Sequence, residues 1–185
     1  MMIHLKLPAL SLMTILMACN NRVDKKDARI SSVNMGCQPY FSYDKVEHYY
    51  FDISEEDGWK IERKEKKTAK ESKQVELLIQ GIQRQLSDTT MLKGIDQSGY
   101  IKQDIPKNKF EQLDQVFCER KHKELITTAC IPFYRDILIF KKNGKIIGTA
   151  KICFGCGQNQ IAGTIKNTEE FGQSGDYDKL YNILH

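Results

Sequence analysis

Two cysteines, Cys153 and Cys156, are separated by two residues in the segment KICFGC, directly after an apolar run typical of a strand. A C-x-x-C spacing occurs in thiol redox centres, in zinc sites and in simple disulfide frameworks, so the spacing alone does not decide the chemistry. The choice depends on whether the chain is exported and on where the other cysteines lie. These are Cys19, Cys37, Cys118 and Cys130.

The N-terminus predicts export. Lys6 and a short polar start precede an apolar core over residues 7–18, which is shorter than the roughly 20 apolar residues of a membrane-spanning helix. The core ends in Leu-Met-Ala-Cys, which resembles the lipobox of bacterial lipoproteins. That resemblance implies transfer of diacylglycerol to the Cys19 thiol, cleavage between Ala18 and Cys19, and acylation of the new amino terminus. Two or three acyl chains give a stable membrane anchor, whereas one does not.

The chain therefore divides into three expected parts. Residues 1–18 are a lipoprotein signal peptide, residues 19–38 a lipidated N-terminus with a flexible tether, and residues 39–185 a single domain. The expected location is a bacterial cell membrane or outer membrane, lipid-anchored and facing the periplasm or the exterior. Asn20 rather than aspartate after the lipidation site favours the outer membrane if the cell has two membranes.

Three segments of the mature chain, CIPFYRDILIF, AKICFGC and FGQSGDYDKL, resemble a group of small, uncharacterised bacterial envelope lipoproteins. The resemblance supports the expected location and implies no particular activity.

Composition agrees with a small globular domain. Hydrophobic residues make up 41% of the chain and charged residues 28%, and the net charge of +4 is too small to indicate nucleic-acid binding. Residues 60–73 are rich in lysine but interleaved with glutamates, which favours a solvated surface over a headgroup-binding patch. The expected partners are the membrane, through the lipid anchor, and an envelope protein or cell-wall component.

Hydrophobic periodicity predicts helices. Val75, Leu78, Ile79, Ile82 and Leu86 fall on one face of a helix.

A second helix follows Pro106, where Asn108 and Glu111 fit a capping box. A third, short helix closes the chain, with Asp176 as its expected N-cap.

Strands are predicted over residues 46–53, around the segment GYIKQDI, on both sides of Asn143-Gly144, and over residues 159–165. The segment SEEDG after the first strand is read as a turn. Asn143 and Gly144 suit a two-residue type I′ turn, which would pair Phe140 with Ile147. The expected fold class is α+β, with a largely antiparallel sheet of four to five strands, two longer helices and a short C-terminal helix.

The hairpin register also brings the cysteines together. It places Cys130 opposite Gly157, and we therefore expect Cys130, Cys153 and Cys156 to cluster at one end of the sheet. A structural disulfide is the first choice for this cluster. A zinc site completed by Cys118 or His122 is the second, and catalytic redox chemistry is the third because no neighbour visible in the sequence lowers a thiol pKa.

Signatures of hydrolases are incomplete. The segment GQSG, residues 172–175, lacks one spacer of the G-x-S-x-G elbow, and the chain has no H-E-x-x-H motif. Asp176 and Asp178 are a weak calcium pattern, and residues 134–136, Tyr-Arg-Asp, are read as a local hydrogen-bonded group. We expect a structural or binding module rather than an enzyme; the alternatives are an exported thiol-disulfide oxidoreductase and a zinc-stabilised domain.

Overall fold

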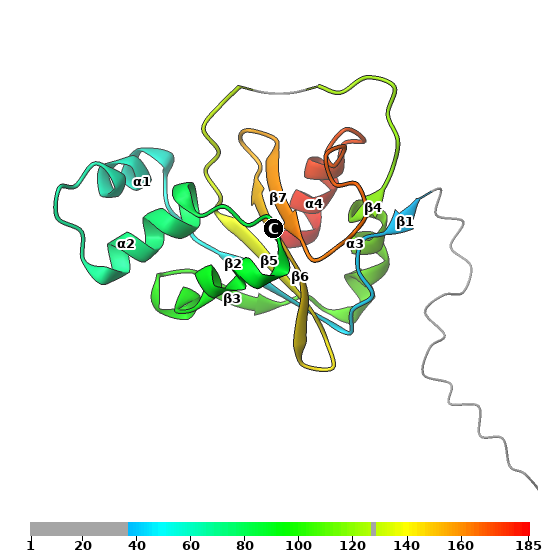
Figure 1. The fold of residues 1–185 in the computed structure, drawn as a ribbon, viewed down its shortest axis with the longest axis horizontal. Coiled ribbons are helices and arrows are strands. Elements are labelled where there is room, and N and C mark those ends of the chain that lie inside the picture. The colour runs from blue at the N-terminus through cyan, green and yellow to red at the C-terminus, as the bar shows by residue number, and fades with distance from the viewer. Residues whose placement is uncertain (1–36, 127–128) are drawn as a thin grey trace, which may run out of the picture. The chain divides into compact units, whose positions relative to one another are not determined.

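The computed structural model describes residues 37–126 and 129–185 (Figure 1). The predicted signal peptide, Cys19 and the tether up to residue 36 lie outside the described residues. The α-helices are α1 (Glu55–Glu62), α2 (Ala69–Val75), α3 (Phe110–Val116) and α4 (Asp176–Leu184). A π-helical turn, η1 (Glu76–Gln80), and the 3-10 helices η2 (Leu86–Leu92), η3 (Ile95–Gln97) and η4 (Lys107–Lys109) complete the helical segments. The strands are β1 (Gln38–Pro39), β2 (Lys45–Tyr50), β3 (Ile101–Asp104), β4 (Cys118–Glu119), β5 (Asp136–Lys142), β6 (Lys145–Cys153) and β7 (Gln158–Ala162).

The main sheet confirms the predicted α+β class. Its strand order is β3-β2-β5-β6-β7, and every neighbouring pair is antiparallel. β1 and β4 form a separate two-stranded ladder. The segment GYIKQDI contributes β3, as predicted, and α4 is the short C-terminal helix.

The hairpin between β5 and β6 has the predicted turn but a shifted register. Asn143 and Gly144 both have positive φ, and Lys142 pairs with Lys145 as expected. A bulge between Phe140 and Lys141 then moves the register by one residue, so Phe140 pairs with Gly148 instead of Ile147. A methyl group on Gly148 would lie 2.3 Å from the ring of Phe41. The bulge therefore places a glycine where Phe41 packs on the sheet.

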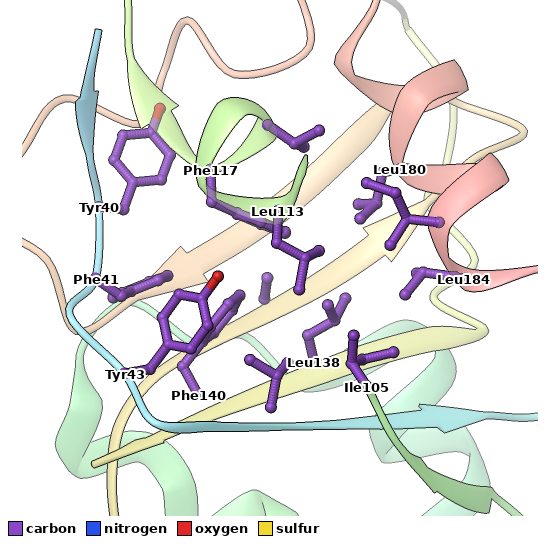
Figure 2. Close-up of a cluster of buried hydrophobic side chains, with 14 of the residues drawn as sticks. Tyr40, Phe41, Tyr43, Ile105, Leu113, Phe117, Leu138, Phe140, Leu180 and Leu184 are labelled. Carbon is purple, nitrogen blue, oxygen red and sulfur yellow. The ribbon is translucent and has the colours of Figure 1, made fainter. Parts of the chain in front are cut away.

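The sheet is covered on both faces, and each face has its own core. One core joins sheet residues such as Leu138 and Phe140 to α3 and α4 through Leu113, Phe117 and Leu180 (Figure 2). The second core joins the opposite face, including Ile137 and Ile139, to residues of η1, η2 and η3. The strands are therefore apolar on both faces, as predicted for strands within a sheet.

The first predicted helix is shorter than expected. α2 begins with a capping box between Thr68 and Glu71, continues as η1, and stops at Gly81, whose N–H donates to the Glu76 carbonyl at 2.6 Å. A side chain at Gly81 would collide with that carbonyl oxygen. Ile82 is consequently 59% exposed instead of lying on the predicted apolar face.

Three local predictions are wrong at helix starts. The segment SEEDG is the beginning of α1, because Ser54 caps the helix and acidic residues fill its first turn, where they favour the helix dipole. No capping box forms between Asn108 and Glu111, since η4 occupies that position and Lys109 precedes α3. The N-cap of α4 is Gly175, at φ 69°, and not Asp176.

Within the described ranges, no helix is long and apolar enough to cross a bilayer.

Candidate functional site

Four cysteines of the described residues are in disulfides. Cys130 is bonded to Cys156, and Cys118 is bonded to Cys37. Cys37 and Gln38 fall in the expected tether, but the disulfide and the pairing of β1 with β4 attach them to the domain. Because Cys118 is bonded to Cys37, it does not complete a zinc site with the C-x-x-C pair.

The third cysteine of the expected cluster, Cys153, is a free thiol. It is 1% exposed and its sulfur accepts a hydrogen bond from the Phe133 N–H at 3.2 Å. The two disulfides close loops between positions 81 and 26 residues apart, which restricts the unfolded chain and stabilises the folded one. Their role is structural.

Two buried residues, His48 and Asp136, form a polar cluster with the exposed His185, although no sequence motif connects the three. Nε2 of His48 lies 2.7 Å from the Asp136 carboxylate, and Nε2 of His185 lies 3.0 Å from the same oxygen. The possible ligand atoms of these three side chains all lie within 4.8 Å of one another, so a metal site has to be considered.

The tautomer of His48 argues against a metal here. Nε2 of Gln103 lies 3.2 Å from the Leu184 carbonyl oxygen, to which it donates, and 2.7 Å from Nδ1 of His48. An amide nitrogen only donates, so Nδ1 of His48 accepts and its Nε2 carries the proton given to Asp136. Metal binding through Nε2 would move the ring proton to Nδ1, where it would face the donating amide of Gln103. The cluster is a hydrogen-bond network that fastens the end of α4 to β2, β3 and β5.

A lysine is buried on the opposite face of the sheet. Lys151 is fully buried, its ammonium donates to the Gly81 carbonyl at 2.6 Å, and it lies 4.5 Å from the centre of the Tyr134 ring. Burial lowers the pKa of Lys151 to about 7. Its strand neighbour on β7 is Gln160.

Beside Gln160 lies an open groove of about 490 Å³ along β7, which ends the strand order of the sheet. Gln83 lines this groove and is 2% exposed, yet among the described residues neither atom of its amide has a hydrogen-bond partner. Its backbone N–H donates to Oε1 of Gln160 at 2.9 Å. An unpartnered buried amide costs about 1–3 kcal/mol, so this group is suited to a ligand that enters the groove. Apolar side chains on its walls are Ile82, Leu125, Ile126, Ile161 and Phe171.

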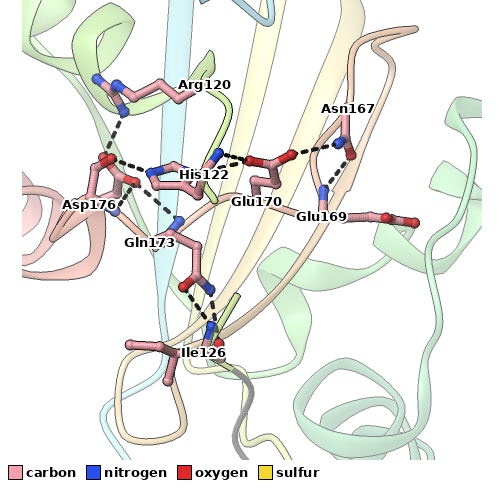
Figure 3. Close-up of polar contacts among 10 residues, drawn as sticks. Arg120, His122, Ile126, Asn167, Glu169, Glu170, Gln173 and Asp176 are labelled. Atoms are coloured by element: carbon pink, nitrogen blue, oxygen red, sulfur yellow. Dashed lines mark hydrogen bonds and ion pairs between the residues drawn. The ribbon is translucent and has the colours of Figure 1, made fainter. Parts of the chain in front are cut away.

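The wall of the groove is held by polar contacts between residues 119–126 and residues 167–176 (Figure 3). Arg120 forms an ion pair of 2.9 Å with Asp176, and the amide of Gln173 bonds both backbone groups of Ile126. The Asp176 carboxylate also accepts from the N–H groups of Gly172 and Ser174. The expected N-cap therefore organises the loop before α4 rather than the helix itself.

His122 is at the centre of these contacts, and its side-chain partners are not cysteines. Its Nε2 lies 2.8 Å from Oγ of Ser174, and its Nδ1 lies 3.1 Å from a carboxylate oxygen of Glu170. Ser174 belongs to the GQSG segment that sequence motifs did not identify as a hydrolase elbow. Sequence spacing could not connect these residues, because His122 and Ser174 are 52 residues apart.

Comparison of the chain with protein-family models, with curated protein sequences and with solved structures found no match.

Proposed function

We propose that the protein is a lipid-anchored protein of the bacterial cell envelope whose domain binds an extended peptide segment of a partner protein along β7. The observation that carries the binding proposal is the unpartnered, buried amide of Gln83 in the wall of an open groove. An amide side chain offers one donor and one acceptor side, which matches a peptide group of an extended chain.

The position of the groove supports a peptide rather than a compact ligand. β7 is the last strand in the order of the described sheet, and an edge strand can pair with an added strand. Its five residues span roughly 17 Å, enough to pair with a similar length of peptide. Ile82 and Ile126 line the groove and are 59% and 79% exposed, so apolar side chains of a bound strand would find contacts beyond the main chain.

The lipid anchor is supported by the Leu-Met-Ala-Cys segment before the mature chain. Its test is Cys19→Ser, which should leave the precursor uncleaved or release the protein from the membrane fraction. A variant that fractionates and migrates like the wild type would contradict lipidation.

Peptide binding can be tested by selecting a phage-displayed library of random ten-residue peptides on the mature protein. Selected peptides should lose about tenfold or more in affinity for Ile126→Asp and for Gln83→Leu. Ile165→Asp is the matched control, because Ile165 is fully exposed and does not line the groove. Binding that is lost in Ile165→Asp but kept in the two groove variants, or a library without enriched peptides, would reject the proposal.

A further inference from the structure

We infer that Ser174, His122 and Glu170 form an acyl-transfer site in which Ser174 attacks small carboxylic esters. This inference is independent of peptide binding at β7, because it depends on the hydrogen bonds of His122 alone. Ser174 and Glu170 belong to the loop before α4, and His122 belongs to the segment after β4. Figure 3 shows His122 beside Glu170.

The hydrogen bonds select one tautomer of the neutral His122 ring. An ionised carboxylate only accepts, so Nδ1 of His122 donates its proton to Glu170 at 3.1 Å. In the neutral ring Nε2 is then the acceptor, and it receives the hydroxyl proton of Ser174 at 2.8 Å. A nucleophile, a base within hydrogen-bond reach and a third group that orients the base are the parts that this chemistry requires.

Glu170 is itself held in place. One carboxylate oxygen accepts from the backbone N–H of His122 as well as from its ring, and the other accepts from the Asn167 amide at 3.4 Å. The side chains of His122 and Glu170 are 20% and 17% exposed, so the base is oriented by protein groups and still reaches the surface. This arrangement makes Glu170 a positioning residue.

The reaction needs only the ester and water. Oγ of Ser174 forms a bond to the ester carbonyl carbon as its proton passes to Nε2 of His122. The ester C–O bond then breaks, the alcohol leaves with the proton from His122, and the acyl group stays on Ser174. Water then forms a bond to the acyl carbon and gives a proton to Nε2 of His122. The bond between the acyl carbon and Oγ breaks, the carboxylic acid leaves, and the proton on His122 returns to Oγ.

Ester hydrolysis at Ser174 should be slow. The N–H of Ser174 donates to Asp176 and is not available to a developing oxyanion. Loss of one oxyanion donor reduces kcat by about 10²–10³ in enzymes that use it. The first backbone N–H groups of α4 have no acceptor within the helix, and they follow Gly175, the N-cap that comes after Ser174. We expect them to supply part of that stabilisation. We therefore expect covalent labelling to be easier to detect than turnover.

The test is labelling of the mature protein with a fluorophosphonate, followed by peptide mass mapping and by hydrolysis of p-nitrophenyl acetate. The expected result is a single modification on Ser174. Ser174→Ala should abolish it, and His122→Ala should reduce its rate by about 10²–10⁴, the range of general-base catalysis. Ser42→Ala, at an exposed serine whose hydroxyl accepts a hydrogen bond from Lys142, should label like the wild type.

Two further measurements separate chemistry from loss of structure. Added imidazole should restore labelling of His122→Ala if the ring acts as a base, which a merely structural role would not allow. The labelled residue in the wild-type protein decides the question even if a variant does not fold. No modification of Ser174, or modification that is equally fast without His122, would overturn the inference.

Discussion

The ammonium group of Lys151 lies against the carbonyl oxygen of Gly81, at 2.6 Å, in the interior of the domain. Gly81 ends the helical segment formed by α2 and η1, so this hydrogen bond joins a helix end to the middle of β6. A carbonyl dipole and the Tyr134 ring compensate a buried charge only in part, and the pKa of Lys151 falls to about 7 because burial disfavours the charged form. The domain therefore contains an amine that titrates near neutral pH.

Stability should rise with pH between about 7 and 10.5 because of Lys151. In that window the unfolded chain holds a proton on this lysine that the folded chain has released, so the free energy of unfolding increases by about 1.4 kcal/mol per pH unit. Lys151→Met should remove this dependence. Urea unfolding of both proteins at several pH values measures it.

Lys145→Met is the matched control, because Lys145 lies on the same strand and is exposed. Its unfolding curves should follow those of the wild type at every pH. Parallel pH profiles for Lys151→Met and the wild type would mean that Lys151 keeps its ordinary pKa in the folded protein.

The unpartnered amide of Gln83 predicts a gain in stability on its removal. Gln83→Leu keeps the backbone N–H bond to Gln160 and takes away a buried amide without partners, so it should stabilise by about 1–3 kcal/mol. Gln160→Leu should have the opposite effect, since it leaves the Gln83 N–H without its acceptor. Thermal unfolding compares the two variants, and a destabilised Gln83→Leu would show that its amide has a structural role.

The turn between β5 and β6 offers a clean test of backbone conformation. Gly144 has φ 76°, and no atom lies within 4 Å of the position that a Cβ would take. Gly144→Val should therefore destabilise by about 1–3 kcal/mol through its backbone alone. Lys145→Val, one residue later in the strand, should change little. Equal melting temperatures for Gly144→Val and the wild type would be inconsistent with this turn.

Local patterns predicted the elements better than their junctions. The alternation and turn residues of β5 and β6 were sufficient to predict the hairpin, because a type I′ turn is determined by two adjacent residues. The register beyond Phe140 was not predictable, since the bulge places Gly148 against the ring of Phe41, a contact between residues about a hundred positions apart. The end of the first helix also involves a distant contact. The Gly81 N–H donates to the Glu76 carbonyl nearby, and the Gly81 carbonyl accepts from Lys151, 70 residues later.

The residues of the candidate sites are brought together almost entirely by contacts between distant parts of the sequence. His122 was a candidate zinc ligand by residue type, and only the loop before α4 shows that its partners are Ser174 and Glu170. Asp136 was read as part of a local group, but its partners are His48 and His185, at the two ends of the described chain. In neither of these two groups are the residues close enough in sequence to form a recognisable motif. An unpartnered amide such as that of Gln83 has no sequence signal at all.

The cysteines give the last prediction. Mass mapping of the non-reduced mature protein should find peptides linked through Cys37–Cys118 and Cys130–Cys156, with Cys153 as a thiol. Iodoacetamide should leave Cys153 unmodified in the native state, because it is 1% exposed, and should modify it in guanidinium chloride. The C-x-x-C spacing would then be incidental, with one cysteine in a disulfide and the other in the core. A peptide linked through Cys153 and Cys156, or rapid alkylation of Cys153 in the folded protein, would contradict this assignment and favour thiol chemistry.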